Sequence, residues 1–482
     1  MAAEPVTPPA AASSPHAAQS PAVPAVAEGQ GGRGCQYPTP GASSAGDRRS
    51  PHAAAPNGEV GSIAAPPPLR LVFWELTARC NLACRHCRAE AREAAVAGEL
   101  TSAEVCRVAA DIRSAADPIL VLTGGEPLAR PDLFDLARTC TQLFSRVALA
   151  TNGTLVDDAV ARRLVETGIR RVSVSLDGAS AATHDAFRGQ TGCFAAALGG
   201  LEALRRAGAS LQVNATVTRH NDRELPQLLD LARSCGAEAF HVFMLVPVGC
   251  GAEISEDQRL SPQRFEEVLI WLAEQTLELR GRLQIKATCA PQYYRILRDL
   301  AQARGVALPG HPGHPNAVKF LAAPSVADGQ VGRGCQDPTP VASLAGDRQS
   351  PRAAKQNGKL NGIADHPGGP GGAPGLHAFT RGCLAGSGVC FISRTGEVQP
   401  CGYLPLSVGN LRSQSLGTLW REAEIFAALR DPSRLRGKCG ACGYRVLCQG
   451  CRARAYALTG DYLGAEPDCP YEPKGWSAGA KP

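Results

Sequence analysis

Short runs of apolar residues alternate with amphipathic segments between residues 70 and 250. Each run has the length of a buried strand, and the segments between the runs follow the helical period. Nearly continuous apolar runs are typical of strands that are buried on both faces of a parallel sheet. We therefore expect six strands, at 71–77, 119–123, 146–151, 171–176, 211–218 and 239–246.

The segments between the runs carry signals for the start of helices. Thr101 and Glu104 form a capping box, and Pro262 directly follows the capping residue Ser261. Further helices are expected at 132–143, 157–167, 194–207 and 224–234. Alternating strands and helices predict an α/β fold, in which the parallel sheet curves into a partial (β/α)6 TIM-like barrel. In such a barrel the active-site residues lie on the loops that follow the strands.

Composition separates this region from its flanks. Residues 1–69 consist largely of Ala, Pro, Gly and Ser, and we expect them to be disordered. The same composition returns at 301–378, where the sequence beginning at Gly329 repeats much of the sequence beginning at Gly29. We expect a barrel at 70–300, a flexible insert with this duplicated tract at 301–378, a small domain at 379–475 and a disordered tail at 476–482.

Charge and hydropathy exclude several classes of partner. The 50 Lys and Arg residues against 44 Asp and Glu give a net charge of +6 over 482 residues, too weak to predict binding to nucleic acid or a membrane surface. The longest apolar run is about half of the ~20 residues that a membrane span needs. We expect a cytoplasmic protein. Its 19 cysteines then favour metal or cluster ligation over disulfides.

Three cysteines lie in the loop after the first predicted strand. Cys80, Cys84 and Cys87 have C-x3-C-x2-C spacing, and a GGEP motif follows the second strand. Three thiolates bind three irons of a 4Fe-4S cluster and leave the fourth iron open for catalysis. The alternative is a structural zinc ion whose fourth ligand is His86 or a distant cysteine.

These motifs, together with TNG and SLDG after the next two strands, resemble the radical S-adenosylmethionine (SAM) superfamily. The resemblance implies that Cys80, Cys84 and Cys87 bind a 4Fe-4S cluster whose open iron is chelated by SAM. It implies that the GGE motif holds the methionyl amine and that the following strand ends contact the rest of SAM, with an arginine for its carboxylate. The cofactor-binding residues implied in this way are Gly124, Gly125, Glu126, Asn152, Ser175, Asp177 and Arg188.

Eight further cysteines lie between 383 and 469 and resemble the SPASM extension of radical SAM enzymes. The resemblance implies one or two auxiliary 4Fe-4S clusters. One set of ligands would be Cys439, Cys442, Cys448 and Cys469, and the second Cys383, Cys390, Cys401 and Cys451. Two residues, rather than the three of the usual SPASM pattern, separate Cys448 from Cys451. The sequence therefore does not decide whether the second cluster forms. Zinc held by four thiolates is the alternative.

Longer stretches at 175–189, 286–296 and 382–405 resemble the radical SAM enzymes of the siroheme-dependent heme pathway, most of all its heme b branch. The resemblance implies oxidative decarboxylation of two propionates of Fe-coproporphyrin III to vinyls, with a tetrapyrrole substrate and a low-potential electron donor such as ferredoxin or flavodoxin. Didecarboxysiroheme or the heme d1 precursor are alternative substrates. A SPASM peptide maturase and a non-catalytic cluster carrier are alternatives of other classes. The candidates for holding the tetrapyrrole are His241, Lys286, Cys289, Tyr293 and Arg295.

Overall fold

The computed structural model describes residues 66–306, 308 and 382–476 of the chain. The predictions of a disordered tract at 1–69 and of a flexible, partly duplicated insert at 301–378 fall almost entirely outside these residues, as does the predicted tail. The predicted barrel and the predicted C-terminal domain fall inside them.

The strands of the described region form one ten-stranded sheet in the order β10-β9-β8-β1-β2-β3-β4-β5-β6-β7. Strands β1 to β7 pair in parallel with their neighbours in chain order. The first six begin within one residue of the positions that the apolar runs predict. The barrel strands are β1 (Leu71–Glu75), β2 (Ile119–Thr123), β3 (Val147–Thr151), β4 (Arg171–Ser175), β5 (Ser210–Val217), β6 (Ala239–Met244) and β7 (Gln284–Thr288).

Two strands extend the predicted six at opposite ends of the sheet. Strand β7 pairs with β6, and its residues alternate between buried Ile285 and Ala287 and the less buried Gln284, Lys286 and Thr288. At the other end, β8 (Val389–Ile392) of the C-terminal part pairs in parallel with β1. Strands β9 (Glu397–Gln399) and β10 (Gly409–Asn410) continue from β8 in antiparallel order. The C-terminal part therefore extends the barrel sheet beyond β1.

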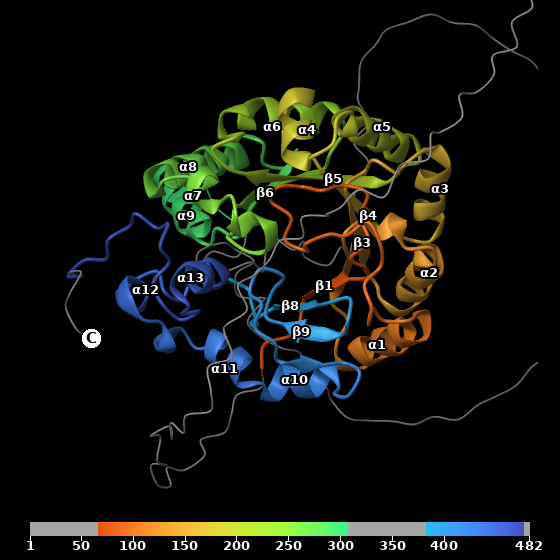
Figure 1. Ribbon diagram of the computed structural model, residues 1–482. Coiled ribbons are helices and arrows are strands. Elements are labelled where there is room, and N and C mark those ends of the chain that lie inside the picture. Colours follow the sequence, from red (N-terminus) through yellow and green to blue (C-terminus); the bar gives the residue numbers. More distant parts are fainter. Residues whose placement is uncertain (1–65, 307, 309–381, 477–482) are drawn as a thin grey trace, which may run out of the picture. The chain divides into compact units, whose positions relative to one another are not determined.

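Helices cover the outer face of the sheet, and the C-terminal elements fill the remaining part of the ring (Figure 1). The barrel helices are α1 (Ser102–Ala115), α2 (Leu133–Leu143), α3 (Asp158–Glu166), α4 (Ala181–Arg188), α5 (Cys193–Arg206), α6 (Leu225–Ser234), α7 (Ser255–Gln258), α8 (Pro262–Glu278) and α9 (Gln292–Ala303). The C-terminal helices are α10 (Leu416–Glu422), α11 (Glu424–Arg430), α12 (Gly437–Ala441) and α13 (Arg452–Thr459). The predicted capping box at the start of α1 and the Ser261 cap of α8 are both present.

The two faces of the sheet have different surroundings. Trp74, Leu122 and Phe240 are fully buried in the core between sheet and helices, and such side chains each contribute about 1.5–3 kcal/mol. The inner face is more polar, because alternate residues of β5 from Ser210 onward line a cavity inside the barrel. The barrel thus has an apolar outer layer and a partly open centre.

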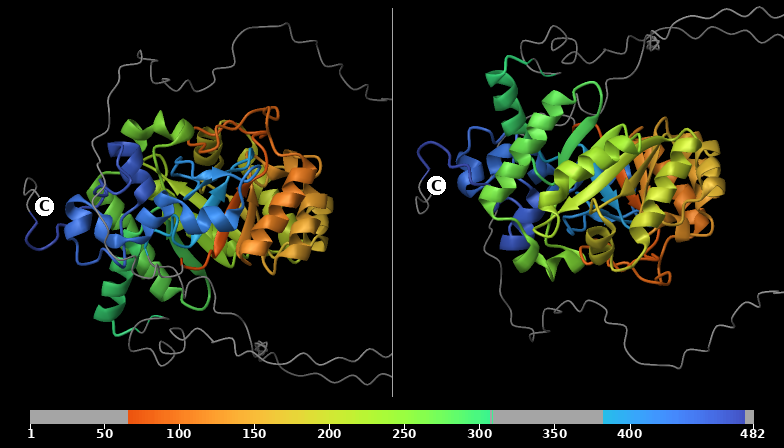
Figure 2. Two further views of the ribbon diagram at one scale, coloured as in Figure 1. Left: turned by 90° about the horizontal axis from the view of Figure 1, so that it is seen from below. Right: turned by 90° about the horizontal axis from the view of Figure 1, so that it is seen from above.

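A buried arginine joins the C-terminal part to the barrel. The Arg454 guanidinium, on α13, lies 3.4 Å from Glu466 and 3.2 Å from Asp468. It also donates hydrogen bonds to the carbonyl oxygens of Met244 and Leu245, at 3.4 and 3.2 Å, where β6 ends. Both views of Figure 2 show the blue C-terminal elements against the barrel. Helix α13 is therefore fixed to one end of β6. In the part of the chain that the structure describes, no helix has the length and apolar character of a membrane span.

Candidate active site

The loop that follows β1 carries the three closely spaced cysteines. A backbone N–H donates to the sulfur of Cys80 at 3.4 Å, and another donates to the sulfur of Cys87 at 3.5 Å. Arg188 donates to the sulfur of Cys84 at 3.7 Å. Burial raises the pKa of the Cys80 thiol to about 11. Such N–H donors orient thiolates and stabilise their charge once iron has replaced the protons.

Glycines allow other loops to approach the cysteine loop closely. A Cβ atom at Gly125 would lie 2.5 Å from the carbonyl oxygen of Ala78, and one at Gly249 would lie 2.4 Å from the carbonyl oxygen of Cys87. Gly249 also has a φ of 58°, in the region that favours glycine. The cysteine loop therefore lies in a cradle that larger residues would fill, and its path suits a bound cluster.

Glu126 of the GGEP motif lies behind the cavity rather than on it. It is fully buried, and its carboxylate accepts hydrogen bonds from the Thr151 hydroxyl at 2.8 Å and from the backbone N–H groups of Asn152 and Leu128 at 2.7 and 3.1 Å. Burial raises its pKa despite these donors. The carboxylate thus connects the GGEP loop to the end of β3. Gly124, Gly125, Asn152 and Ser175 do line the cavity.

Asp177, Arg188 and His86 form one ionic network at the ends of β4 and α4. The Asp177 carboxylate lies 2.7 Å from the Arg188 guanidinium and 3.2 Å from Nε2 of His86. Burial alone would raise the pKa of Asp177, but the Arg188 guanidinium and the hydrogen bond to His86 hold it well below its usual range. His86 also stacks on Phe187, with 4.1 Å between ring centroids. The sequence suggests His86 only as a zinc ligand, because contacts between different loops leave no spacing signal along the chain.

A cavity of about 700 Å³ extends from the cysteine loop through the centre of the barrel. Asp177 is the single carboxylate among the described residues that line it, whereas its cationic side chains lie at several levels. The cationic side chains on its wall are Arg88, Arg146, Arg170, Arg171, Arg188 and Lys286. Three of these cations, Arg88, Arg171 and Arg188, already pair with carboxylates. Arg146, Arg170 and Lys286 therefore supply the positive charge on the described wall that suits an anionic molecule inside the barrel.

Of the five candidates for holding a tetrapyrrole, the structure places three in this cavity. His241, Lys286 and Cys289 line it. Tyr293 is buried, and its hydroxyl shares a hydrogen bond of 2.5 Å with Thr276 in the packing of α8 against α9. Arg295 pairs with Glu266 and lines a separate small cavity. The last two candidates therefore lie away from the large cavity, because the α9 helix turns them outward.

The first predicted auxiliary set converges on the small cavity. Its volume is about 30 Å³, and the four cysteines on its wall are Cys439, Cys442, Cys448 and Cys469. Backbone N–H groups donate to the sulfurs of Cys439, Cys442 and Cys448 at 3.3, 3.4 and 3.4 Å. The buried side chain of Arg452 donates to the Cys439 sulfur at 3.7 Å. The structure thus gathers four thiols and their N–H donors around one point, as cluster ligands require.

The second predicted set does not converge in full. Cys383, Cys401 and Cys451 lie together on the wall of the large cavity. Cys390 lies on β8 beside Val72 of β1 and is fully buried in the main core. A β-strand sends successive side chains to opposite faces, and this one turns Cys390 away from the other three.

The spacing of the cysteines bears on the zinc alternative. Four sulfurs around one zinc ion, each at ~2.3 Å from it, are roughly 3.8 Å apart. Among the residues that the structure describes, only His184, Asp185 and Cys193 place three potential ligand atoms within 4.8 Å of one another. The cysteine motifs are therefore spread more widely than a zinc ion requires, which favours the larger iron-sulfur cluster.

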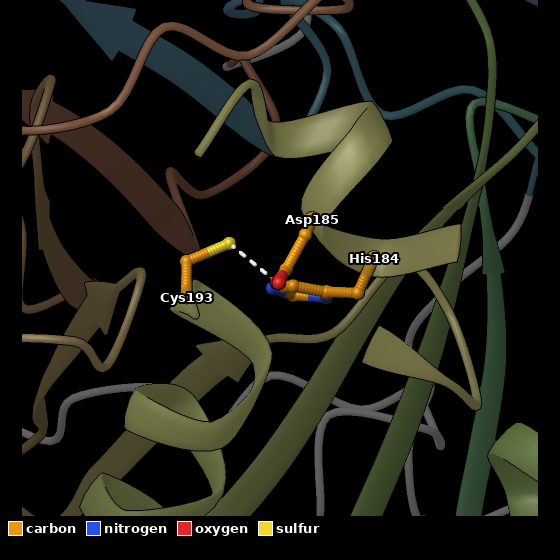
Figure 3. A group of neighbouring side chains, drawn as sticks. All are labelled: His184, Asp185 and Cys193. Carbon is orange, nitrogen blue, oxygen red and sulfur yellow. Dashed lines mark hydrogen bonds between the residues drawn. The ribbon is translucent and has the colours of Figure 1, made fainter. Parts of the chain in front are cut away.

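The group of His184, Asp185 and Cys193 serves the packing of α4 against α5 (Figure 3). Nδ1 of His184 accepts a hydrogen bond from the backbone of Asp177 at 3.1 Å. The Asp185 carboxylate accepts from the Cys193 thiol at 3.2 Å and from two backbone N–H groups at 2.6 and 2.7 Å. Burial lowers the pKa of His184 to about 4. These ligand atoms already have structural partners.

Comparison with known proteins agrees with this geometry. Residues 74–232 match the radical SAM superfamily, and residues 383–451 match the SPASM iron-sulfur cluster-binding domain. The chain is 42% identical to the AdoMet-dependent heme synthase of Methanosarcina barkeri over 84% of its own length and 97% of that protein. It is 32% identical to the pre-heme d1 synthase of Dinoroseobacter shibae, over 84% of this chain and 87% of that protein.

Solved structures share the fold. The structure of anSMEcpe with bound AdoMet aligns with a TM-score of 0.54 and 17% identity over 83% of this chain and 94% of that chain. Streptococcus suis SuiB bound to S-adenosylmethionine aligns with a TM-score of 0.57 and 14% identity over 84% of this chain and 77% of that chain.

Fold, cysteine loop and C-terminal domain together define a radical SAM enzyme that uses SAM and 4Fe-4S clusters, including auxiliary ones. Its relatives narrow the class further. The chain belongs to the SPASM-bearing branch of the radical SAM superfamily that acts in heme biosynthesis.

Proposed function

We propose that the enzyme oxidatively decarboxylates two propionates of Fe-coproporphyrin III to vinyl groups and so makes heme b. The observation that carries this proposal is the 700 Å³ cavity, which joins the cysteine loop to a wall rich in arginine and lysine. Its volume lies within the ~300–1,000 Å³ typical of small-molecule sites. A macrocycle with four propionates needs such cations. The 42% identity to an AdoMet-dependent heme synthase supports the same substrate class.

The residues of the cysteine loop and its neighbours would hold the radical-generating cofactors. Cys80, Cys84 and Cys87 would ligate the cluster, and the backbone of Gly124 and Gly125 would face the SAM amine. Cluster and SAM together supply a 5′-deoxyadenosyl radical that removes hydrogen from an unactivated C–H bond.

Neighbouring side chains position these ligands. Glu126 positions the GGEP loop through its three hydrogen bonds. Asp177 holds the Arg188 guanidinium beside the Cys84 sulfur, where an arginine can pair with the SAM carboxylate. Asn152 and Ser175, which lie on the cavity wall, would contact the remainder of SAM.

Lys286 is the clearest candidate for binding a propionate. It lies on the inner face of β7 and has no carboxylate partner within the described residues. Burial lowers its pKa to about 8, so it is still a cation at neutral pH and gains most from a bound anion. Arg146 and Arg170, where β3 and β4 begin, would bind propionates at the other end of the cavity.

The second half of the reaction needs an electron acceptor. Each propionate that becomes a vinyl group releases carbon dioxide, one hydrogen atom and one electron. Cys439, Cys442, Cys448 and Cys469 would hold an auxiliary cluster, and the wide range of cluster potentials includes values suited to accept that electron. A reduced ferredoxin or flavodoxin would supply electrons to the cluster of the barrel.

The reconstituted enzyme tests this proposal directly. Under anaerobic conditions with SAM and dithionite, Fe-coproporphyrin III should give heme b and about two 5′-deoxyadenosines per heme, because each propionate consumes one radical. Chromatography of both products measures the ratio. Turnover of didecarboxysiroheme or of the heme d1 precursor, with Fe-coproporphyrin III unchanged, would contradict it.

A further inference from the structure

Four cysteines from three separate segments meet on the wall of the large cavity. Cys289 follows β7 of the barrel, Cys383 and Cys401 flank the β8–β9 hairpin, and Cys451 precedes α13. All four line the cavity. Cys289, Cys383 and Cys401 pack with the buried Cys451 in one cluster of side chains, and the thiols of Cys289 and Cys451 are hydrogen bonded. This is the number of thiolates that a fully ligated 4Fe-4S cluster needs.

The backbone at Cys289 is held in an unusual conformation. Its φ is 58°, in the left-handed region that residues with a side chain rarely adopt. Such a conformation is strained and persists where the surroundings impose it, most often at functional sites. At Cys289 this left-handed backbone conformation occurs at the residue whose thiol contacts Cys451.

A sharp turn separates the two groups of cysteines in the C-terminal part. Gln449 and Gly450, between Cys448 and Cys451, have φ values of 65° and 66°. Cys448 therefore lines the small cavity while Cys451 lines the large one. The spacing of two residues between Cys448 and Cys451 departs from the usual SPASM pattern. It still places Cys448 at the small cavity and Cys451 at the large one.

Charge at the site suits an anionic cluster. The buried guanidinium of Arg454, which also pairs with Glu466 and Asp468, interacts electrostatically with both Cys451 and Cys289, and the Glu466 carboxylate opposes it at Cys451. Lys286, two strand positions before β7 ends, also interacts with Cys289. A cluster with four thiolate ligands carries net negative charge, and cations at this depth offset it more strongly than they would in water. Cys390 has no such neighbours, since burial alone raises its pKa.

We propose that Cys289, Cys383, Cys401 and Cys451 hold a second auxiliary 4Fe-4S cluster, with Cys289 of the barrel in the place expected for Cys390. This inference rests on the cluster chemistry of the proposed function and not on the identity of the tetrapyrrole. The cluster would join the barrel to the C-terminal part and would lie on the wall of the substrate cavity itself.

Two matched variants of the full-length chain test the ligand set. After anaerobic reconstitution, Cys289→Ala should lose the iron and sulfide of one cluster, about four irons per chain, or retain a three-iron form with its own paramagnetic signal. Cys390→Ala should keep full iron content and the wild-type spectra. Mössbauer and electron paramagnetic resonance spectra of the reduced proteins identify which cluster changes. Loss of a cluster in Cys390→Ala, with Cys289→Ala unchanged, would overturn the proposal.

Two controls separate this result from misfolding and from failure of the proposed function. Cys289→Ser keeps the shape of the side chain and should fold like the wild type, yet alter the spectrum of one auxiliary cluster. Iron counts and spectra need no substrate, so they stand even if Fe-coproporphyrin III is not turned over. If Cys289 instead ligated the porphyrin iron, Cys289→Ala would shift the Soret band of bound Fe-coproporphyrin III at unchanged iron content, and that outcome would also overturn the proposal.

Discussion

Lys286 shows how one residue can serve binding at the expense of stability. Its ammonium lies inside the barrel with no carboxylate beside it in the described part of the chain, and burial lowers its pKa to about 8. The charged form is favoured in the unfolded chain and disfavoured in the folded one. A propionate would supply the missing partner, because an opposite charge restores the stability of the ammonium.

We expect the affinity for Fe-coproporphyrin III to fall as the pH rises through about 8, where the Lys286 ammonium is lost. Between pH 7 and pH 9 the fraction of Lys286 that carries a charge drops about tenfold. The dissociation constant should therefore rise by up to about tenfold over the same range. Spectroscopic titration of the dissociation constant measures it. Lys286→Met should bind weakly at both pH values, and a Lys286→Met profile that matches the wild type would contradict the assignment.

The same variant should be more stable than the wild type at neutral pH. No carboxylate that the structure describes lies beside Lys286, so removing its buried charge should raise the unfolding free energy by about 0.5–2 kcal/mol, with the lower end expected where Cys289 holds an anionic cluster. Thermal unfolding of the holoenzyme measures the change. A lower melting temperature would show that Lys286 has a structural partner, and weak binding could then not be assigned to the lost charge alone.

Replacing Cys84 by Ala should abolish reductive cleavage of SAM, because two thiolates hold the barrel cluster poorly and its open iron loses its geometry. Production of 5′-deoxyadenosine under dithionite measures this. Cys106→Ala is the matched control, since Cys106 is a half-buried thiol on α1, outside the cysteine loop. Undiminished cleavage in Cys84→Ala would contradict the radical SAM assignment of this loop.

At the scale of elements, the sequence predicts most strands but misses those with unusual surroundings. Strands β1 to β6 are visible because their apolar residues are nearly continuous or alternate with polar ones, in β5 over eight positions. Strand β7 is hidden, since its five residues include only two apolar ones, Ile285 and Ala287, between Gln284, Lys286 and Thr288. Strand β8 is short, and its pairing with β1 depends on a contact between residues far apart in the chain. Local patterns carry no information about such a contact.

The predicted site depends on the same distinction. Cys80, Cys84 and Cys87 share one loop, so their spacing along the chain reports their proximity in space. Cys289 and Cys390 show the limit of that logic. Its place in the SPASM pattern assigns Cys390 to a set of ligands, although its strand turns the side chain into the core. Cys289 lies in the barrel and belongs to no cysteine-spacing motif, although it packs with the other three cysteines.

Replacing Arg454 by Leu should destabilise the holoenzyme by about 3–5 kcal/mol, because Glu466 and Asp468 would remain buried without their cation. Arg434→Leu is the control, since Arg434 pairs with Glu424 at the surface and should contribute about 0–1 kcal/mol. Thermal unfolding compares the two variants. Equal melting temperatures would show that helix α13 is attached to the barrel by other contacts.

At the scale of the whole molecule, the barrel and the C-terminal part should perform separable half-reactions. Cys442→Ala should still cleave SAM, since the cysteine loop and the GGEP motif are unchanged. It should form far less heme b, because the electron released with carbon dioxide can no longer pass through the cluster held by Cys439, Cys442, Cys448 and Cys469. The paired measurement is 5′-deoxyadenosine and heme b from one anaerobic reaction, with iron counted to confirm loss of one cluster. Full heme b yield without that cluster would remove its role as acceptor.

The pairing of β1 with β8 has a consequence for how the chain is made. Strand β1 leaves the ribosome first, but its neighbour β8 follows roughly 300 residues later, about 15–60 s at ~5–20 residues per second. Throughout that time the nascent chain has an unpaired, largely apolar edge at Leu71–Glu75, the kind of edge on which chains aggregate. The barrel is therefore a late product of synthesis, although its first strand is an early one.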